Sequence, residues 1–131
     1  MSHGPNFVAS GNIGTARFVT ISGQNQVAQS VAGDMPIGIS TDAQKYPPIP
    51  QNTNTYAAEA GDGVRVFTNG EYCLLTAGAG GWSAGDVLKP DANGEGVVAA
   101  ETSPQPIGAR ALEDAAAGEL SRVVVEIHTP A

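Results

Sequence analysis

The sequence contains little cysteine, few aromatic residues and little basic charge. Cys73 is the one cysteine among 131 residues, so the chain can form neither an internal disulfide nor a cysteine-based metal cluster. Aromatic residues make up 5%, and six Lys and Arg stand against 13 Asp and Glu, for a net charge of -7. A chain with this charge is poorly suited to the phosphate backbone of nucleic acids, and we expect no nucleic-acid partner.

Long hydrophobic runs are also missing. No apolar stretch approaches the ~20 residues that cross a bilayer, and Met1 to Ala16 lacks the basic start and apolar centre of a signal peptide. We therefore expect a soluble protein with no membrane partner. No segment longer than about ten residues both lacks Gly and Pro and has apolar residues at helical spacing. Long helices are therefore not expected either.

The sequence is rich in turn-forming and β-branched residues. It has 17 Gly and 9 Pro, and 41% of its residues are hydrophobic. Short Val- and Ile-rich runs alternate with Gly, Pro, Asn and Asp, a pattern typical of strands joined by tight turns. The Asn-Gly pairs at 69–70 and 93–94 are expected to close β-hairpins. Candidate strands cover residues 16–21, 26–30, 37–40, 63–68, 72–76, 86–88, 96–100, 107–112 and 120–127.

These features predict an all-β fold, a compact small β-barrel or β-tulip-like domain. An internal duplication gives it two related β units. At a spacing of about 70 residues, Pro36-Ile37-Gly38 matches Pro106-Ile107-Gly108. Similarly, the motif beginning Gly61-Asp62 corresponds to the one beginning Gly118-Glu119. We predict an extended N-terminal arm over residues 1–16 and a single β domain over 17–131. Its related units would span about 17–76 and 82–128, with a Pro-rich insertion at 42–60.

The residue types that catalysis requires are not grouped along the chain. His3 and His128 lie near the two ends, and neither has a nearby Ser or Cys in a recognisable nucleophile arrangement. Cys73 sits in an apolar run, where cysteine usually behaves as a small buried hydrophobe. The Gly-rich stretch at 78–81 is not followed by the Lys and Ser or Thr of a phosphate-binding loop. We expect no catalytic residues, no metal and no cofactor, although an enzyme site assembled only in space stays an alternative.

Two segments have little to bury by themselves, the N-terminal arm and the Pro-rich insertion. Residues 46–50 should favour polyproline II, and contact with another chain is the more attractive interpretation for them. The lone Trp82 either packs in the core or inserts into a neighbouring subunit. The candidate contact residues are Phe7, Tyr46, Pro47, Pro48, Ile49, Pro50, Tyr56 and Trp82.

The order of the motifs is distinctive over about residues 17–128. It runs Pro-Ile-Gly-Ile at 36–39, Gly-Asp-Gly-Val-Arg-Val at 61–66, Ala-Gly-Asp-Val-Leu at 84–88, Asn93-Gly94, Pro-Ile-Gly-Ala at 106–109 and Ala-Gly-Glu at 117–119. This order resembles the small capsid-decoration, or cement, proteins of tailed bacteriophages. The resemblance implies an all-β protein without enzymatic activity that binds the outside of an expanded icosahedral head.

The resemblance also implies partners and a location. The partners would be the major capsid protein, whose adjacent copies are clamped together, and other copies of this chain in a homotrimer. The protein would be made in the host cytoplasm and reside on the outer surface of the virion. Because acidic residues concentrate in residues 61–131, we expect the near-neutral first part to face the capsid. The alternative is a virion appendage that binds a host receptor or a carbohydrate.

Overall fold

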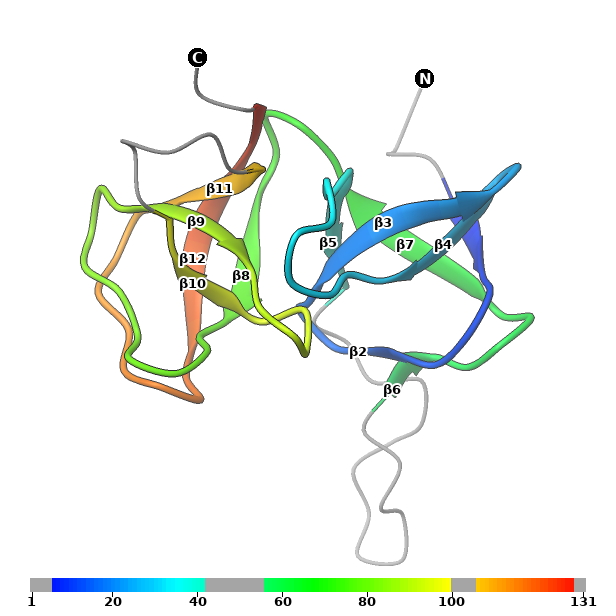
Figure 1. The fold of residues 1–131 in the computed structure, drawn as a ribbon, viewed down its shortest axis with the longest axis horizontal. Helices are drawn as coiled ribbons and strands as arrows, with labels where there is room; N and C mark the ends of the chain where they lie inside the picture. Colours follow the sequence, from blue (N-terminus) through cyan, green and yellow to red (C-terminus); the bar gives the residue numbers. More distant parts are fainter. Residues whose placement is uncertain (1–5, 42–55, 100–105, 129–131) are drawn as a thin grey trace, which may run out of the picture.

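The computed structural model describes residues 6–41, 56–99 and 106–128 (Figure 1). All regular structure in these residues is β, which confirms the predicted all-β class. The strands are β1 (Asn6–Ala9), β2 (Ile13–Gly14), β3 (Phe18–Gly23), β4 (Gln26–Gln29), β5 (Gly38–Ser40), β6 (Tyr56–Ala58), β7 (Gly63–Phe67), β8 (Tyr72–Thr76), β9 (Val87–Pro90), β10 (Gly96–Val98), β11 (Ile107–Ala111) and β12 (Leu120–His128).

Each of the nine candidate strands is found within a few residues of its predicted position. Alternation of side chains explains why. In β7, Val64 and Val66 are buried while Arg65 between them is exposed, as period-two patterning requires. The N-terminal arm was predicted wrongly, because from Asn6 onward it forms β1 and β2. These short strands find their partners far along the chain, where no local pattern reveals them.

The first unit is a closed barrel with strand order β1-β4-β3-β5-β7. β3 and β4 form an antiparallel hairpin, and β1 closes the barrel by pairing parallel to β4 and antiparallel to β7. β2 and β6 form a separate two-stranded sheet beside it (Figure 1). The barrel interior is filled mainly by small and β-branched side chains: Ala9, Ile13, Val19, Val27, Ala58, Val64 and Val66.

The second unit repeats this arrangement with strand order β10-β9-β11-β12-β8. Its strands correspond in that order to β4, β3, β5, β7 and β1. The register repeats as well. Val8 of β1 pairs with Gly63 of β7, and at the equivalent position of the second unit Thr76 of β8 pairs with Leu120 of β12. The parallel pairing of β1 with β4 in the first unit is reduced in the second to one isolated parallel bridge, between Ala77 and Gly96. The second unit is therefore a barrel with a looser closure.

This correspondence moves the unit boundaries from those predicted. β1 and β8 each open their own unit, so the units run from β1 to β7 and from β8 to β12 rather than over 17–76 and 82–128. The Asn69-Gly70 turn consequently connects the two units, and its prediction as a hairpin turn was wrong. The Asn93-Gly94 turn does close a hairpin, between β9 and β10.

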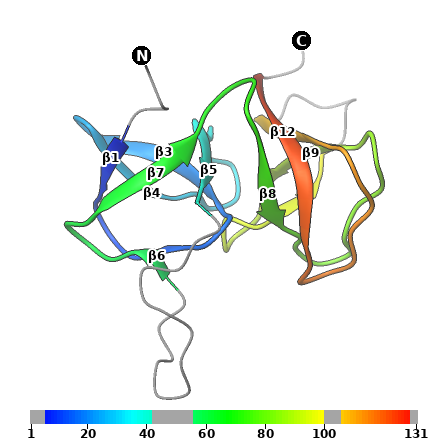
Figure 2. The same ribbon diagram turned by 180° about the vertical axis from the view of Figure 1, so that it is seen from behind.

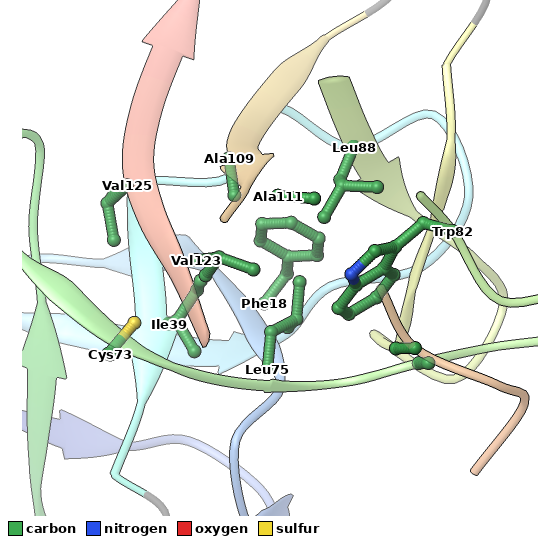
Figure 3. Packing of buried hydrophobic residues seen from close by; sticks show 12 residues of the cluster. Phe18, Ile39, Cys73, Leu75, Trp82, Leu88, Ala109, Ala111, Val123 and Val125 are labelled. Carbon is green, nitrogen blue, oxygen red and sulfur yellow. The ribbon is translucent and has the colours of Figure 1, made fainter. Parts of the chain in front are cut away.

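The two units are joined through the start of β3. The backbone N–H of Thr76 donates to the carbonyl of Ala16 at 2.9 Å, and that of Phe18 donates to the carbonyl of Gly94 at 2.8 Å. The Phe18 ring is fully buried among side chains of the second unit, including Leu75 and Leu88 (Figure 3). Residues of the first unit thus occupy the opening between β8 and the β9–β10 turn, and the two units share one core.

Candidate partner-binding surface

Of the contact residues predicted from the sequence, the structure describes Phe7, Trp82 and the backbone of Tyr56. Phe7 is half-buried against the core of the first unit, and the backbone of Tyr56 pairs with Gly14. Trp82 is only 5% exposed, and its indole Nε1 donates to the carbonyl of Glu113 at 2.8 Å. A ring held in this way has no free face to insert into a neighbour, so the structure shows core packing for Trp82 (Figure 3). Tyr46, Pro47, Pro48, Ile49 and Pro50 lie outside the described residues.

The burial of Trp82 has a direct spectroscopic consequence. Because Trp82 is the sole tryptophan, its emission reports on one site. We expect the native protein to emit at shorter wavelength than the unfolded chain, with iodide quenching reduced several-fold relative to that chain. Fluorescence of the purified protein with and without denaturant measures both quantities. Emission at the wavelength of the unfolded chain, quenched equally well, would contradict the packing seen here.

In the second unit β8 and β12 lie side by side (Figure 2), and β11 pairs with the other edge of β12. Cys73, Leu75 and Val123 point into the core, so the residues that alternate with them point outward. Tyr72 is 70% exposed, Leu120 50% and Leu112 41%. We call this outward surface the β8–β12 face; it consists of Tyr72, Leu74, Arg110, Leu112, Leu120, Arg122, Val124 and Glu126.

A pocket of about 220 Å³ opens beside this face, and we call it the junction pocket. It is lined by Phe67, Tyr72, Cys73, Leu74 and Arg122. Phe67 ends β7 and so belongs to the first unit, whereas the other lining residues belong to the second. The Arg65 guanidinium lies 4.7 Å from the centre of the Phe67 ring, a geometry that fits a cation–π contact. The pocket therefore combines two aromatic walls with Arg122, and Arg65 lies against one of those aromatic rings.

The four arginines of the chain differ in their pairing. Arg17 lies 3.5 Å from a carboxylate oxygen of Glu95, and Arg110 lies 3.1 Å from one of Glu126. The exposed side chains of Arg65 and Arg122 pair with no carboxylate in the described part of the chain. Glu113 contacts Arg122 only at its backbone N–H, which donates to Glu113 Oε1 at 3.4 Å. Among the residues that the structure describes, Arg122 in the pocket lining and Arg65 beside Phe67 thus have no carboxylate partner.

The described residues offer little for other kinds of site. Within 6–41, 56–99 and 106–128, no three His, Cys, Asp or Glu side chains are close enough to hold a metal ion. No helix in those ranges is long and apolar enough to span a bilayer. Cys73 is buried, as its apolar surroundings in the sequence predicted. The β8–β12 face with the junction pocket is therefore the strongest candidate for a functional surface.

The sequence did carry a signal for this face that the prediction missed. In Tyr72-Cys73-Leu74-Leu75, strand alternation places Tyr72 and Leu74 on the side opposite Cys73 and Leu75. A strand with apolar residues on both sides is buried on both sides or presents one of them to a partner.

By its topology the chain is an all-β protein built from two similar five-stranded units packed in tandem. A solved structure with the same fold is that of the head fiber gp8.5 N base in bacteriophage phi29. It matches with a TM-score of 0.56 and 21% sequence identity, over 93% of this chain and 92% of that chain. At this identity the likeness shows the fold. No protein-family model matches the sequence, and no curated protein is significantly similar to it.

Proposed function

We propose that this protein is a structural component of a bacteriophage head, bound to the outer surface of the assembled shell. The observation that carries the proposal is the fold, shared over 93% of the chain with the N base of a phage head fiber. The motif order resembles capsid-decoration proteins and independently points to the same location. In this role the protein needs a rigid binding surface and no catalytic residues.

The mechanism would be thermodynamic. A protein that binds the assembled shell but not its separated subunits stabilises the shell by linkage, and the stabilisation grows with the logarithm of the free protein concentration once that concentration exceeds the Kd. Clamping of adjacent major capsid proteins follows if one copy contacts two of them. Association into a homotrimer would multiply the attachment points and raise the avidity. A compact β core loses little conformational entropy when it binds, which favours affinity.

Co-sedimentation with purified heads tests the proposal. Expanded heads that lack the protein should carry it into the pellet to a saturating level, whereas dissociated capsid protein should not bind it. Decorated heads should also withstand higher temperature than bare heads before they release DNA. If the protein stays in the supernatant at every concentration, it is not a head-binding protein.

Variants of the Pro-rich insertion extend this experiment. Replacing residues 46–50 with Gly and Ser should weaken retention on heads if the segment contacts the capsid, and unchanged retention would reject that role. Deleting residues 1–15 is not an equivalent test. Because that deletion removes β1, which closes the first barrel, it would disturb folding as well as binding.

A further inference from the structure

We propose that the junction pocket and the adjoining β8–β12 face bind a protein segment in which an Asp or Glu lies next to an apolar side chain. The apolar side chain would enter the pocket between Phe67 and Tyr72, and the carboxylate would meet Arg65 and Arg122. This inference rests on the proposed function for the source of the segment, which would be the phage head. Its chemistry follows from the surface itself.

The apolar part of the argument comes from the outward residues of β8 and β12. Tyr72 and Leu120 expose 70% and 50% of their surface, and Val124 lies opposite Tyr72 across the strand pair. Several exposed large apolar side chains on one side of a strand pair favour an interaction site over a purely solvated surface. Tyr and Arg are also enriched among the residues that dominate binding energy at protein interfaces. The β8–β12 face presents both residue types around one pocket.

The charge part comes from the contrast among the arginines. In a chain with 13 acidic residues, Arg17 and Arg110 have found carboxylates, while Arg65 and Arg122 have none in the described part of the chain. The Arg65 guanidinium lies 4.7 Å from the centre of the Phe67 ring, a contact that favours one placement of this exposed side chain. A preorganised, unpaired guanidinium is suited to accept a carboxylate with little loss of side-chain entropy.

A carboxylate fits this surface better than a phosphate of nucleic acid or lipid. The net charge of -7 opposes approach to DNA and to anionic membranes, whose charge extends far beyond one contact. A single carboxylate carried by a protein segment can instead be matched locally by two arginines. The pocket of about 220 Å³ also has apolar walls, which a neighbouring side chain of the same segment would fill.

Charge reversal on both arginines tests the proposal in the head-binding assay. The double variant Arg65→Glu with Arg122→Glu should bind heads at least about tenfold more weakly than the wild type. The control is Lys89→Glu, one such reversal on β9, which β11 and β12 separate from β8 in the sheet order; at equal net charge it is compared with each single variant, Arg65→Glu and Arg122→Glu, and each of these should bind more weakly than it does. Lys89→Glu should bind within about twofold of the wild type. Tyr72→Ala should weaken binding without changing the net charge, and circular dichroism melts would establish that each variant is folded.

A peptide selection keeps the test independent of the proposed function. Random peptides of about 12 residues would be displayed, selected on the wild-type protein and counter-selected on the double variant. Enriched peptides should place Asp or Glu beside an aromatic or aliphatic residue, and they should not bind the double variant. If the wild-type protein does not bind heads, the proposed function is rejected. The peptide selection then still tests whether the pocket binds acidic segments.

Three results would overturn the inference. The first is equal binding of heads by the wild type and the double variant. The second is a selection that yields no peptides, or peptides without acidic residues or without dependence on the two arginines. The third is arginine-dependent binding of a DNA oligonucleotide or of phosphatidylserine vesicles in place of such peptides, which would identify phosphate as the ligand group.

Discussion

Replacing Phe18 with Ala is expected to lower the free energy of unfolding by about 3 to 5 kcal/mol, the range for removing a buried aromatic ring. Phe18 is fully buried, and its ring packs among Leu75, Leu88 and Ala109 of the second unit (Figure 3). The ring belongs to a strand of the first unit, so its loss leaves a cavity where the two units meet. The walls of that cavity are strands tied into two different barrels, which limits their collapse.

Guanidinium chloride unfolding followed by far-ultraviolet circular dichroism measures this loss. Ile21→Ala is the matched control, because Ile21 lies on the same strand and is 50% exposed. It should change the free energy of unfolding by no more than about 1 kcal/mol, since most of its surface is already in water. Similar losses for both variants would show that Phe18 does not hold the units together.

Gly38→Ala is expected to lower the free energy of unfolding by about 3 kcal/mol, in the upper part of the range for overpacking. A methyl group at Gly38 would overlap the carbonyl oxygen of Phe67 and lie 2.7 Å from Val66 Cγ1. The carbonyl belongs to β7, which pairs with β5 at this point, so relief of the overlap would require the ladder to open. Denaturant unfolding again gives the magnitude.

Gly63→Ala provides the comparison for this second prediction. Gly63 also lies in a strand, but its added methyl group would meet no atom within 4 Å, and its φ is not in the left-handed region. The substitution should be neutral, or stabilising by up to about 0.5 kcal/mol through the unfolded chain. If Gly38→Ala proves as harmless as Gly63→Ala, then β5 and β7 do not approach as closely as the structure shows.

The repeated Pro-Ile-Gly motif acquires a physical explanation from these contacts. At Gly108, the counterpart of Gly38, an added methyl group would overlap the Phe18 ring and lie 2.8 Å from Pro36 Cγ. Gly38 thus permits the close approach of β5 to β7 within the first unit. Gly108 permits the close approach of β11 to Phe18 and Pro36, which belong to the first unit. The two copies retain glycine for related but different packing reasons.

The sequence predicted the strands well wherever side-chain alternation was local. β8, for example, was predicted over residues 72–76 and observed over Tyr72–Thr76. β1 was missed because its four residues become a strand only by pairing with β4 and β7, more than a dozen residues away in either case. Such long-range pairing leaves no periodic pattern that a short segment could display.

Alternation in β8 marked one apolar side of the candidate surface, but the junction pocket and the pairing of the arginines could not be predicted, for a different reason. Phe67 and Tyr72 are close in sequence, yet they belong to separate units, and only strand pairing brings Arg122 opposite Leu74. The pairing of each arginine also depends on the tertiary structure. Arg110 contacts Glu126, for example, because β11 pairs with β12. The composition indicates an acidic chain. It does not indicate that Arg65 and Arg122 would lack a carboxylate partner among the described residues.

The placement of Ala16 and Phe18 in the opening of the second barrel also bears on the cooperativity of unfolding. The second unit has only the Ala77–Gly96 bridge to close its ladder, and it depends on the first unit to cover the gap. Neither barrel can therefore melt alone without exposing apolar surface that belongs to the other. Although its two units repeat one topology, we expect the protein to unfold as one unit, in a single transition that far-ultraviolet circular dichroism and Trp82 fluorescence report at the same denaturant concentration.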